Sequence, residues 1–334
     1  MNRRLAIALR VVAIIAVVAA LWWFVREMDV AALGNALRTA KLWPLLVAAV
    51  LNFLCLLGKA ACWRILLAPR HRVSVTRLFR YTVAAFAASA LAPARAGEVL
   101  RVWTLKRRDG VPAPDTAAVA VAEKLLDGIS MLILVAPVPW LLPGLPSWVA
   151  GAIALCGAIA IALFAALFIA VRRVARDSGA PGGAAARPGV IRRFIAGMHA
   201  LRSPGRVLGS VGVLMLTWAF DLGEVTAVLY AVGIDLPIAA GLLILFTLNL
   251  TIMVPSTPAG VGALEVGAIV ALDLLHVGHE PALAFALLYH GLQVIPIIVV
   301  GLILELRLVL GREAGEAGEA GAAAPHAALD SDST

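Results

Sequence analysis

The sequence predicts an all-α polytopic membrane protein with about six full spans and two re-entrant helical hairpins. The chain has 334 residues, of which 62% are hydrophobic and 14% are charged. Soluble domains are closer to half apolar and a quarter charged, so this excess of apolar surface needs a lipid environment. The apolar residues also come in blocks long enough to cross a hydrocarbon core of roughly 30 Å. We therefore expect most of the chain to lie within a bilayer.

Six apolar blocks have the length of full spans. They cover roughly residues 5–25, 42–66, 115–138, 148–171, 207–232 and 281–306. The first block follows Arg3, Arg4 and Arg10 and resembles a signal peptide, but no small-residue cleavage site precedes Arg26, so we expect an uncleaved span.

The Lys and Arg residues between the blocks indicate the topology. The net charge is +8, and 22 of the 28 Lys and Arg residues fall on one side of the assigned spans. Arg26, Arg38 and Lys41 fall on the other side. The positive-inside rule then places both termini in the cytoplasm. The charge is thus a topology signal, and no nucleic-acid partner is expected.

The segment 73–108 does not behave as a simple span. Basic residues crowd both of its ends, and only residues 81–94 lack charge. Fourteen residues are too few to cross a bilayer as a helix. The segment is therefore predicted to enter from the cytoplasm and return, with its turn at residues 93–98.

The segment 236–277 contains a second break. Residues 255–262 read Pro-Ser-Thr-Pro-Ala-Gly-Val-Gly, and two prolines with two glycines interrupt a helix. We expect a hairpin that enters from the opposite face. The alternative is two full spans joined by a cytoplasmic turn.

The two hairpins resemble each other in spacing. Glu98 precedes Glu123 by 25 residues, and Glu265 precedes His290 by 25 residues. Within a transmembrane domain at 1–310, this pattern predicts an inverted-topology repeat, with a first copy at about 42–138 and a second at about 207–306. Residues 177–203 are expected to form a cytoplasmic loop with an amphipathic helix, and residues 311–334 a disordered cytoplasmic tail.

Charged and polar residues inside the apolar segments are candidates for a functional site, because a charge at mid-bilayer costs on the order of 3 kcal/mol. One interpretation is a cavity for a charged or polar group, in which the N-terminus of a broken helix favours an anion. The other is that these residues pair with one another and hold the hairpins in place. The candidates are Arg95, Glu98, Glu123, Lys124, Asp127, Asp221, Glu224, Glu265, His290 and Gln293.

Neither a cofactor nor a metal site is predicted. Cys55, Cys62 and Cys156 form no CxxC or Cys/His cluster and are expected to be small buried side chains. The phosphate-loop, dinucleotide, zinc-protease and serine-hydrolase motifs are missing from the sequence, which lowers the expectation of an enzyme.

Three motifs resemble those of the lysylphosphatidylglycerol synthase transmembrane-region family, a family of flippase-like membrane proteins. Residues 93–98 (Pro-Ala-Arg-Ala-Gly-Glu) match P-x-R-x-G-E, residues 123–127 match a Glu-Arg…Asp pattern, and residues 255–265 match P-x-x-P-G-G-x-G-x-x-E. This chain has Lys124, Ala259 and His290 where Arg, Gly and Arg are usual. The resemblance implies a head-group path formed by Arg95, Gly97, Glu98, Glu123, Lys124, Asp127, Pro258, Gly260, Gly262, Glu265 and His290.

The resemblance also implies a function in lipid translocation, in the bacterial cytoplasmic (inner) membrane. The expected partners are membrane lipids, of the phospholipid, polyprenyl-phosphate or hopanoid type, with an anionic or polar head group. No soluble aminoacyl-transferase domain is expected, so the chain by itself should not be a synthase. Two alternatives stay open. One is a scaffold or accessory subunit for a lipid-modifying glycosyltransferase or a hopanoid/isoprenoid pathway, and the other is a membrane-embedded transferase. His290 would make the site sensitive to pH, since histidine titrates near neutrality.

Overall fold

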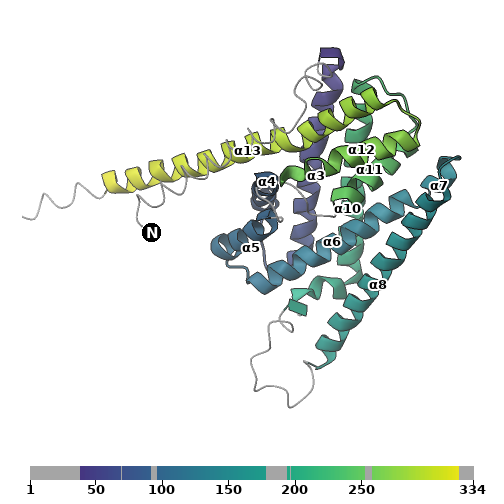
Figure 1. Cartoon of the computed structure of the whole chain (residues 1–334). Coiled ribbons are helices and arrows are strands. Elements are labelled where there is room, and N and C mark those ends of the chain that lie inside the picture. Colours follow the sequence, from purple (N-terminus) through teal and green to yellow (C-terminus); the bar gives the residue numbers. More distant parts are fainter. Residues whose placement is uncertain are drawn as a thin grey trace, which may run out of the picture.

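The computed structural model describes residues 38–68, 70–91, 96–177, 194–195, 197–252 and 258–322. In this part of the chain every regular element is a helix, which confirms the predicted all-α class (Figure 1). The elements are α3 (Leu42–Leu67), α4 (Val75–Leu91), α5 (Ala96–Asp109), α6 (Ala113–Val135), α7 (Val138–Leu141), α8 (Ser147–Asp177), η1 (His199–Arg202), α10 (Pro204–Ala231), α11 (Ile238–Ile252), η2 (Pro258–Gly260), α12 (Ala263–Leu274) and α13 (His279–Ala322).

Four described helices have the length and apolar composition needed to cross a membrane. They are α3, α10 and the segments Ser147–Arg173 of α8 and His279–Ile303 of α13, and each matches a predicted span. Helix α6 matches the predicted span 115–138 and is 23 residues long, about 35 Å. It is not among the four, since Glu123, Lys124 and Asp127 interrupt its apolar sequence. The predicted span 5–25 lies outside the described residues.

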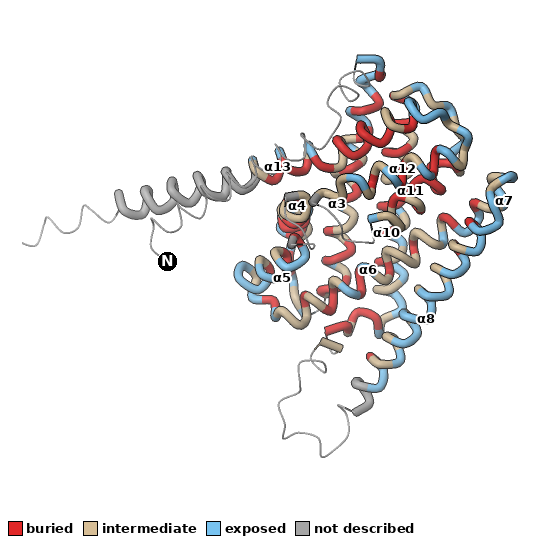
Figure 2. Tube along the Cα trace, viewed as in Figure 1, coloured by how far each residue is buried: buried red, intermediate tan, exposed pale blue. Residues whose placement is uncertain are grey.

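Helix α8 lies at the edge of the bundle (Figure 2). Only 6% of its most apolar stretch is buried, against 56% for α13. Its exposed apolar side chains include Leu155, Ile159, Ile161, Leu163 and Ile169. A surface of this kind is compatible with lipid and not with water, so α8 is a lipid-facing helix.

The same order of elements occurs twice. A long helix, two short helices and a long helix follow one another in α3–α4–α5–α6 and again in α10–α11–α12–α13. Every helix pair in contact within the first set has its counterpart in contact within the second. The contacts between the sets also come in pairs, since α10 packs on α6 as α3 packs on α13, and α13 packs on α4 as α11 packs on α6.

The first helices of the two sets are antiparallel neighbours. The Lys41 amide at the start of α3 donates to the Ala231 carbonyl at the end of α10 over 3.0 Å. In the middle of both helices the Cys55 thiol lies 3.5 Å from the Thr217 carbonyl oxygen. Gly58 faces Thr217 so closely that a Cβ would overlap its hydroxyl. Small residues permit this close approach, which is how helices in lipid gain packing energy.

Helices α4 and α5 pack against each other and are held together at both ends. Where α4 begins and α5 ends, Arg77 donates to Asp109 over 2.6 Å. Near the turn between the helices, the Gly97 amide donates to the Ser89 hydroxyl over 3.1 Å. The helices have 17 and 14 residues, so they measure roughly 26 and 21 Å, less than the roughly 30 Å hydrocarbon core. The predicted turn at 93–98 falls partly outside the described residues, and α5 begins at Ala96.

Helices α11 and α12 form the second pair, with 15 and 12 residues. The backbone between them is broken where the Pro and Gly residues predicted a break. Ala259, Gly260 and Gly262 have φ of 57°, 77° and 84°. This left-handed conformation favours glycine, so Ala259 is the strained member of the three.

The structure describes parts of two peripheral segments. Residues 311–322 continue helix α13, in which Ala and Glu are strong helix formers. In the predicted loop at 177–203, Met198 and Leu201 are buried in the core, and His199 Nε2 lies 3.1 Å from the Ala68 carbonyl oxygen at the end of α3. This described part of the loop therefore packs against the bundle, and residues 178–193 and 323–334 lie outside the described residues.

The contact at Gly97 gives a test of the α4–α5 pair. A methyl group on Gly97 would overlap the Ala85 carbonyl oxygen and the Ser89 hydroxyl. Gly97→Ala should lower the stability by about 1–3 kcal/mol, the usual cost of overpacking. Thermal melts in detergent, followed by circular dichroism, would measure the shift. Gly151→Ala is the matched control, because nothing lies within 4 Å of the added methyl group. Equal melting temperatures for the two variants would contradict the packing.

Candidate functional site

A buried ion pair joins α3 to α6. The Lys59 ammonium lies 3.0 Å from Asp127 Oδ2 and 3.9 Å from Glu123 Oε1. The side chains are 13%, 13% and 4% exposed, respectively. Glu123 and Asp127 are four positions apart and share one face of α6, so one ammonium reaches both carboxylates. Two acidic side chains of α6 are thus paired with a lysine of α3.

Aromatic rings and a second cation surround this ion pair. The Trp218 indole donates to the Asp127 carbonyl oxygen over 3.2 Å, and its ring centre lies 5.9 Å from the Lys59 ammonium. Arg101 of α5 stacks on Trp63, with 3.6 Å between its guanidinium carbon and the ring centre, and donates to Thr82 over 2.7 Å. One carboxylate oxygen of Asp127, Oδ1, is buried and has no hydrogen-bond partner in the described part of the chain. Asp127 can therefore accept a further donor.

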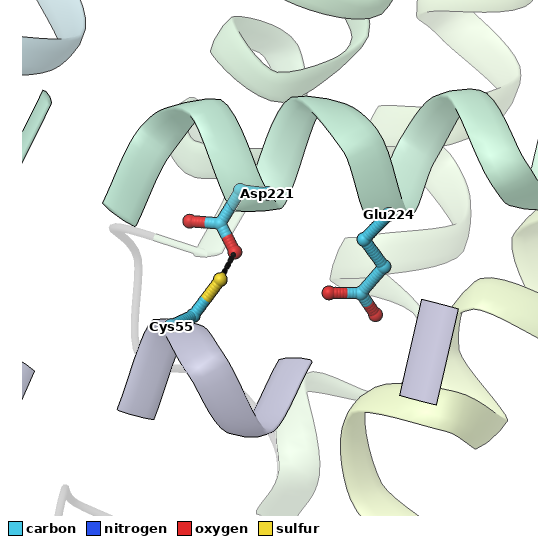
Figure 3. Close-up of side chains that lie close together, drawn as sticks. All are labelled: Cys55, Asp221 and Glu224. Atoms are coloured by element: carbon cyan, nitrogen blue, oxygen red, sulfur yellow. Dashed lines mark hydrogen bonds between the residues drawn. The ribbon is translucent and has the colours of Figure 1, made fainter. Parts of the chain in front are cut away.

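A second polar network lies between α3, α10 and α13. The Asn52 amide donates to Glu224 Oε1 over 3.3 Å, and the Gln293 amide donates to Glu224 Oε2 over 3.2 Å. One turn away, the Cys55 thiol donates to Asp221 Oδ1 over 2.9 Å (Figure 3). Glu224 is fully buried. Its carboxylate is therefore fixed by two neutral amides rather than by a cation.

A third network fixes the break before α12 to the last helix. His290 is fully buried, with Nδ1 2.6 Å from Glu265 Oε1 and Nε2 3.0 Å from the Ala259 carbonyl oxygen. The other oxygen of Glu265 accepts the Gly262 amide over 2.8 Å and caps α12. The positive end of this helix is thus covered by the chain's own carboxylate, where the sequence suggested a site for an anion.

His290 thus links α13 to both sides of the break. A carbonyl oxygen only accepts hydrogen bonds, so His290 Nε2 donates to the Ala259 carbonyl oxygen.

An apolar groove of about 510 Å³ lies between α6, α7 and α8. Its lining is nearly all hydrocarbon and includes Leu132, Ile133, Trp140, Ile153 and Ile161. It has the size and chemistry of a site for an aliphatic chain.

The structure brings together only part of the predicted head-group path. Glu123 and Asp127 meet at Lys59, whereas Gly260, Gly262, Glu265 and His290 meet at the second break. Lys124 and Glu98 are exposed, and Gly97 is a packing residue. Arg95 lies outside the described residues, as does the side chain of Pro258.

Sequence reasoning missed Lys59, Asn52 and Cys55. Lys59 stands within an apolar span, so the rule that intramembrane charges are functional candidates could have selected it. Asn52 and Cys55 are ordinary residues for an apolar helix, and their partners are 172 and 166 positions away. No local pattern in the sequence marks them.

The core between α3, α5, α6 and α10 holds more acidic than basic side chains. Lys59 and Arg101 lie among Glu123, Asp127, Asp221 and Glu224. When ionised, these carboxylates would be neutralised by a cation or by a head group that carries positive charge.

The apolar helices, broken helix pairs and internal charges define a helical integral membrane protein. The chain belongs to the lysylphosphatidylglycerol synthase TM region family, whose model matches residues 7–301. It is also similar to a Haloferax volcanii protein named Glycosyltransferase AglD, at 28% identity over 243 residues. That match covers 60% of this chain and 38% of AglD, so the chain spans well under half of AglD's length.

The paired Lys59 and the exposed Lys106 of α5 give a direct comparison. Lys59→Met should destabilise the protein by about 3–5 kcal/mol, because two buried carboxylates lose their cation. Lys106→Met should change the stability by no more than about 0.5 kcal/mol. Denaturant titrations in detergent, followed by tryptophan fluorescence, would measure both. The double variant Lys59→Met/Asp127→Leu should recover part of the loss. Equal effects of the two lysine substitutions would contradict the pairing.

Proposed function

We propose that the chain is a lipid translocator of the bacterial cytoplasmic membrane, which moves a polar head group between its two broken-helix pairs. The observation that carries this proposal is the set of charges at Lys59, Glu123 and Asp127 inside an apolar bundle. Each charge at mid-membrane costs on the order of 3 kcal/mol to insert, so three charged side chains that served only packing would be unfavourable. No catalytic step is part of this function.

The arrangement of the helices supports a transport function. The two sets have the same element order, and their first helices are antiparallel, as in an inverted repeat. The four helices of the two short pairs are each below the length of a span, so we infer that they are re-entrant, with the backbone breaks covered by neighbouring helices. Transporters of this architecture bind their substrate where the repeats meet. With both termini in the cytoplasm, the two hairpins would enter from opposite faces.

The buried charges favour one kind of head group. The acidic excess and the capped α12 terminus suit an amine-bearing or zwitterionic head better than a purely anionic one. The apolar groove beside α8 would hold an acyl or isoprenoid chain of the lipid. A polar head with a positive charge is therefore the preferred cargo.

A second candidate function is supported by the similarity to AglD. The chain would then be an accessory membrane subunit for a lipid-modifying glycosyltransferase. In that function the intramembrane charges hold the helices together, and neutral replacements that keep their hydrogen bonds should be tolerated.

Reconstitution into vesicles separates the two functions. Fluorescent phospholipids with amine-bearing and with anionic head groups should both be offered, and the amine-bearing lipid should cross faster. Asp127→Asn should slow its transfer by about tenfold, the effect of roughly 1.4 kcal/mol. Lys106→Gln, at an exposed lysine of α5, is the control and should transfer lipid at the original rate. Folded protein that moves no lipid faster than protein-free vesicles would overturn the translocator and favour the accessory subunit.

A further inference from the structure

Three side chains from two antiparallel helices converge inside the bundle. Asp221 and Glu224 are three positions apart on α10 and point toward α3, and Cys55 points toward them from α3 (Figure 3). One sulfur or oxygen atom from each residue lies within 4.8 Å of the other two. The cluster stands at the contact between the two helix sets. The charge of Lys59 acts on Asp221, although Lys59 makes its ion pairs with Asp127 and Glu123.

The three side chains of the cluster are held in place, and their carboxylate oxygens can accept a further ligand. Cys55 is 4% exposed and Glu224 is 0% exposed. The amides of Asn52 and Gln293 fix the two oxygens of Glu224. In the described part of the chain, the only hydrogen bond to Asp221 comes from the Cys55 thiol. A carboxylate oxygen has two lone pairs, so both acids have positions left for a further ligand.

Asp221 and Glu224 make no ion pair in the described part of the chain. Lys59 makes its ion pairs with Asp127 and Glu123, and its charge acts on Asp221 only at longer range. Two ionised carboxylates in a low-dielectric interior are strongly unfavourable unless a cation or a proton neutralises them.

We propose that Cys55, Asp221 and Glu224 bind one divalent transition-metal ion of the Zn²⁺ class. A thiolate with two carboxylates selects a borderline metal over Na⁺ or Mg²⁺, which prefer oxygen alone. On binding, the Cys55 thiol loses its proton to solvent and the thiolate binds the metal. Three protein ligands leave one position of a tetrahedral ion open, as in exchangeable rather than closed structural zinc sites. The ion would neutralise the charges of its ligands and link α3 to α10.

Cobalt substitution tests this site without any assay of lipid transfer. The purified full chain, stripped with a chelator and titrated with Co²⁺, should bind one equivalent. A near-ultraviolet thiolate-to-cobalt band should appear. Because one thiol proton is released, the apparent affinity should rise by about tenfold per pH unit below the thiol's own titration range.

Two pairs of variants assign the ligands. Cys55→Ser should abolish the thiolate band, whereas Cys62→Ser, a buried cysteine on the same helix, should keep it. Asp221→Asn should weaken binding by about tenfold or more, whereas Asp273→Asn on α12 should not. Circular dichroism checks that each variant is folded. No stoichiometric cobalt, or a band that persists in folded Cys55→Ser, would overturn the metal site, and the carboxylates would then be neutralised by protons. Neither outcome would decide whether the chain moves lipid, since that is measured separately in vesicles.

Discussion

The arrangement of this protein depends on how charges are paired inside an apolar bundle. Lys59 cannot stand alone in hydrocarbon, and neither can Glu123 or Asp127, so α3 and α6 must meet where these residues face each other. Trp218 closes the same region from α10 through the Asp127 carbonyl oxygen. Because lipid gives helices no hydrophobic reason to associate, such polar contacts and close packing at small residues decide which helices become neighbours.

The broken helix pairs follow from the same constraint. A helix that stops within a membrane leaves backbone groups without partners, and these must be covered by protein. At the second break Glu265 satisfies the Gly262 amide and His290 binds the Ala259 carbonyl oxygen. At the first pair Ser89 accepts the Gly97 amide. The residues that the family motifs share are therefore, in part, those that make an interrupted helix tolerable, and their presence alone does not identify a substrate.

The polar core changes the functional interpretation. The sequence suggested a site for an anion at the N-terminus of a broken helix. In the described part of the chain Glu265 caps that terminus and binds His290, while four acids lie in the core with Lys59 and Arg101. Ionised acids attract cations, which supports the proposals of an amine-bearing head group and of a metal ion.

The sequence by itself determined the class of protein, the family, four of the apolar spans and the positions of the helix breaks. These follow from length, hydropathy and Pro/Gly placement, which act locally along the chain. Only the tertiary structure decided the partners. Lys124 is adjacent to Glu123, but successive residues of a helix point about 100° apart, so Lys124 is exposed and the ion pair is made by Lys59 of another helix. Cys55 meets Asp221 across 166 positions because two antiparallel helices pack closely, and no local pattern records that contact.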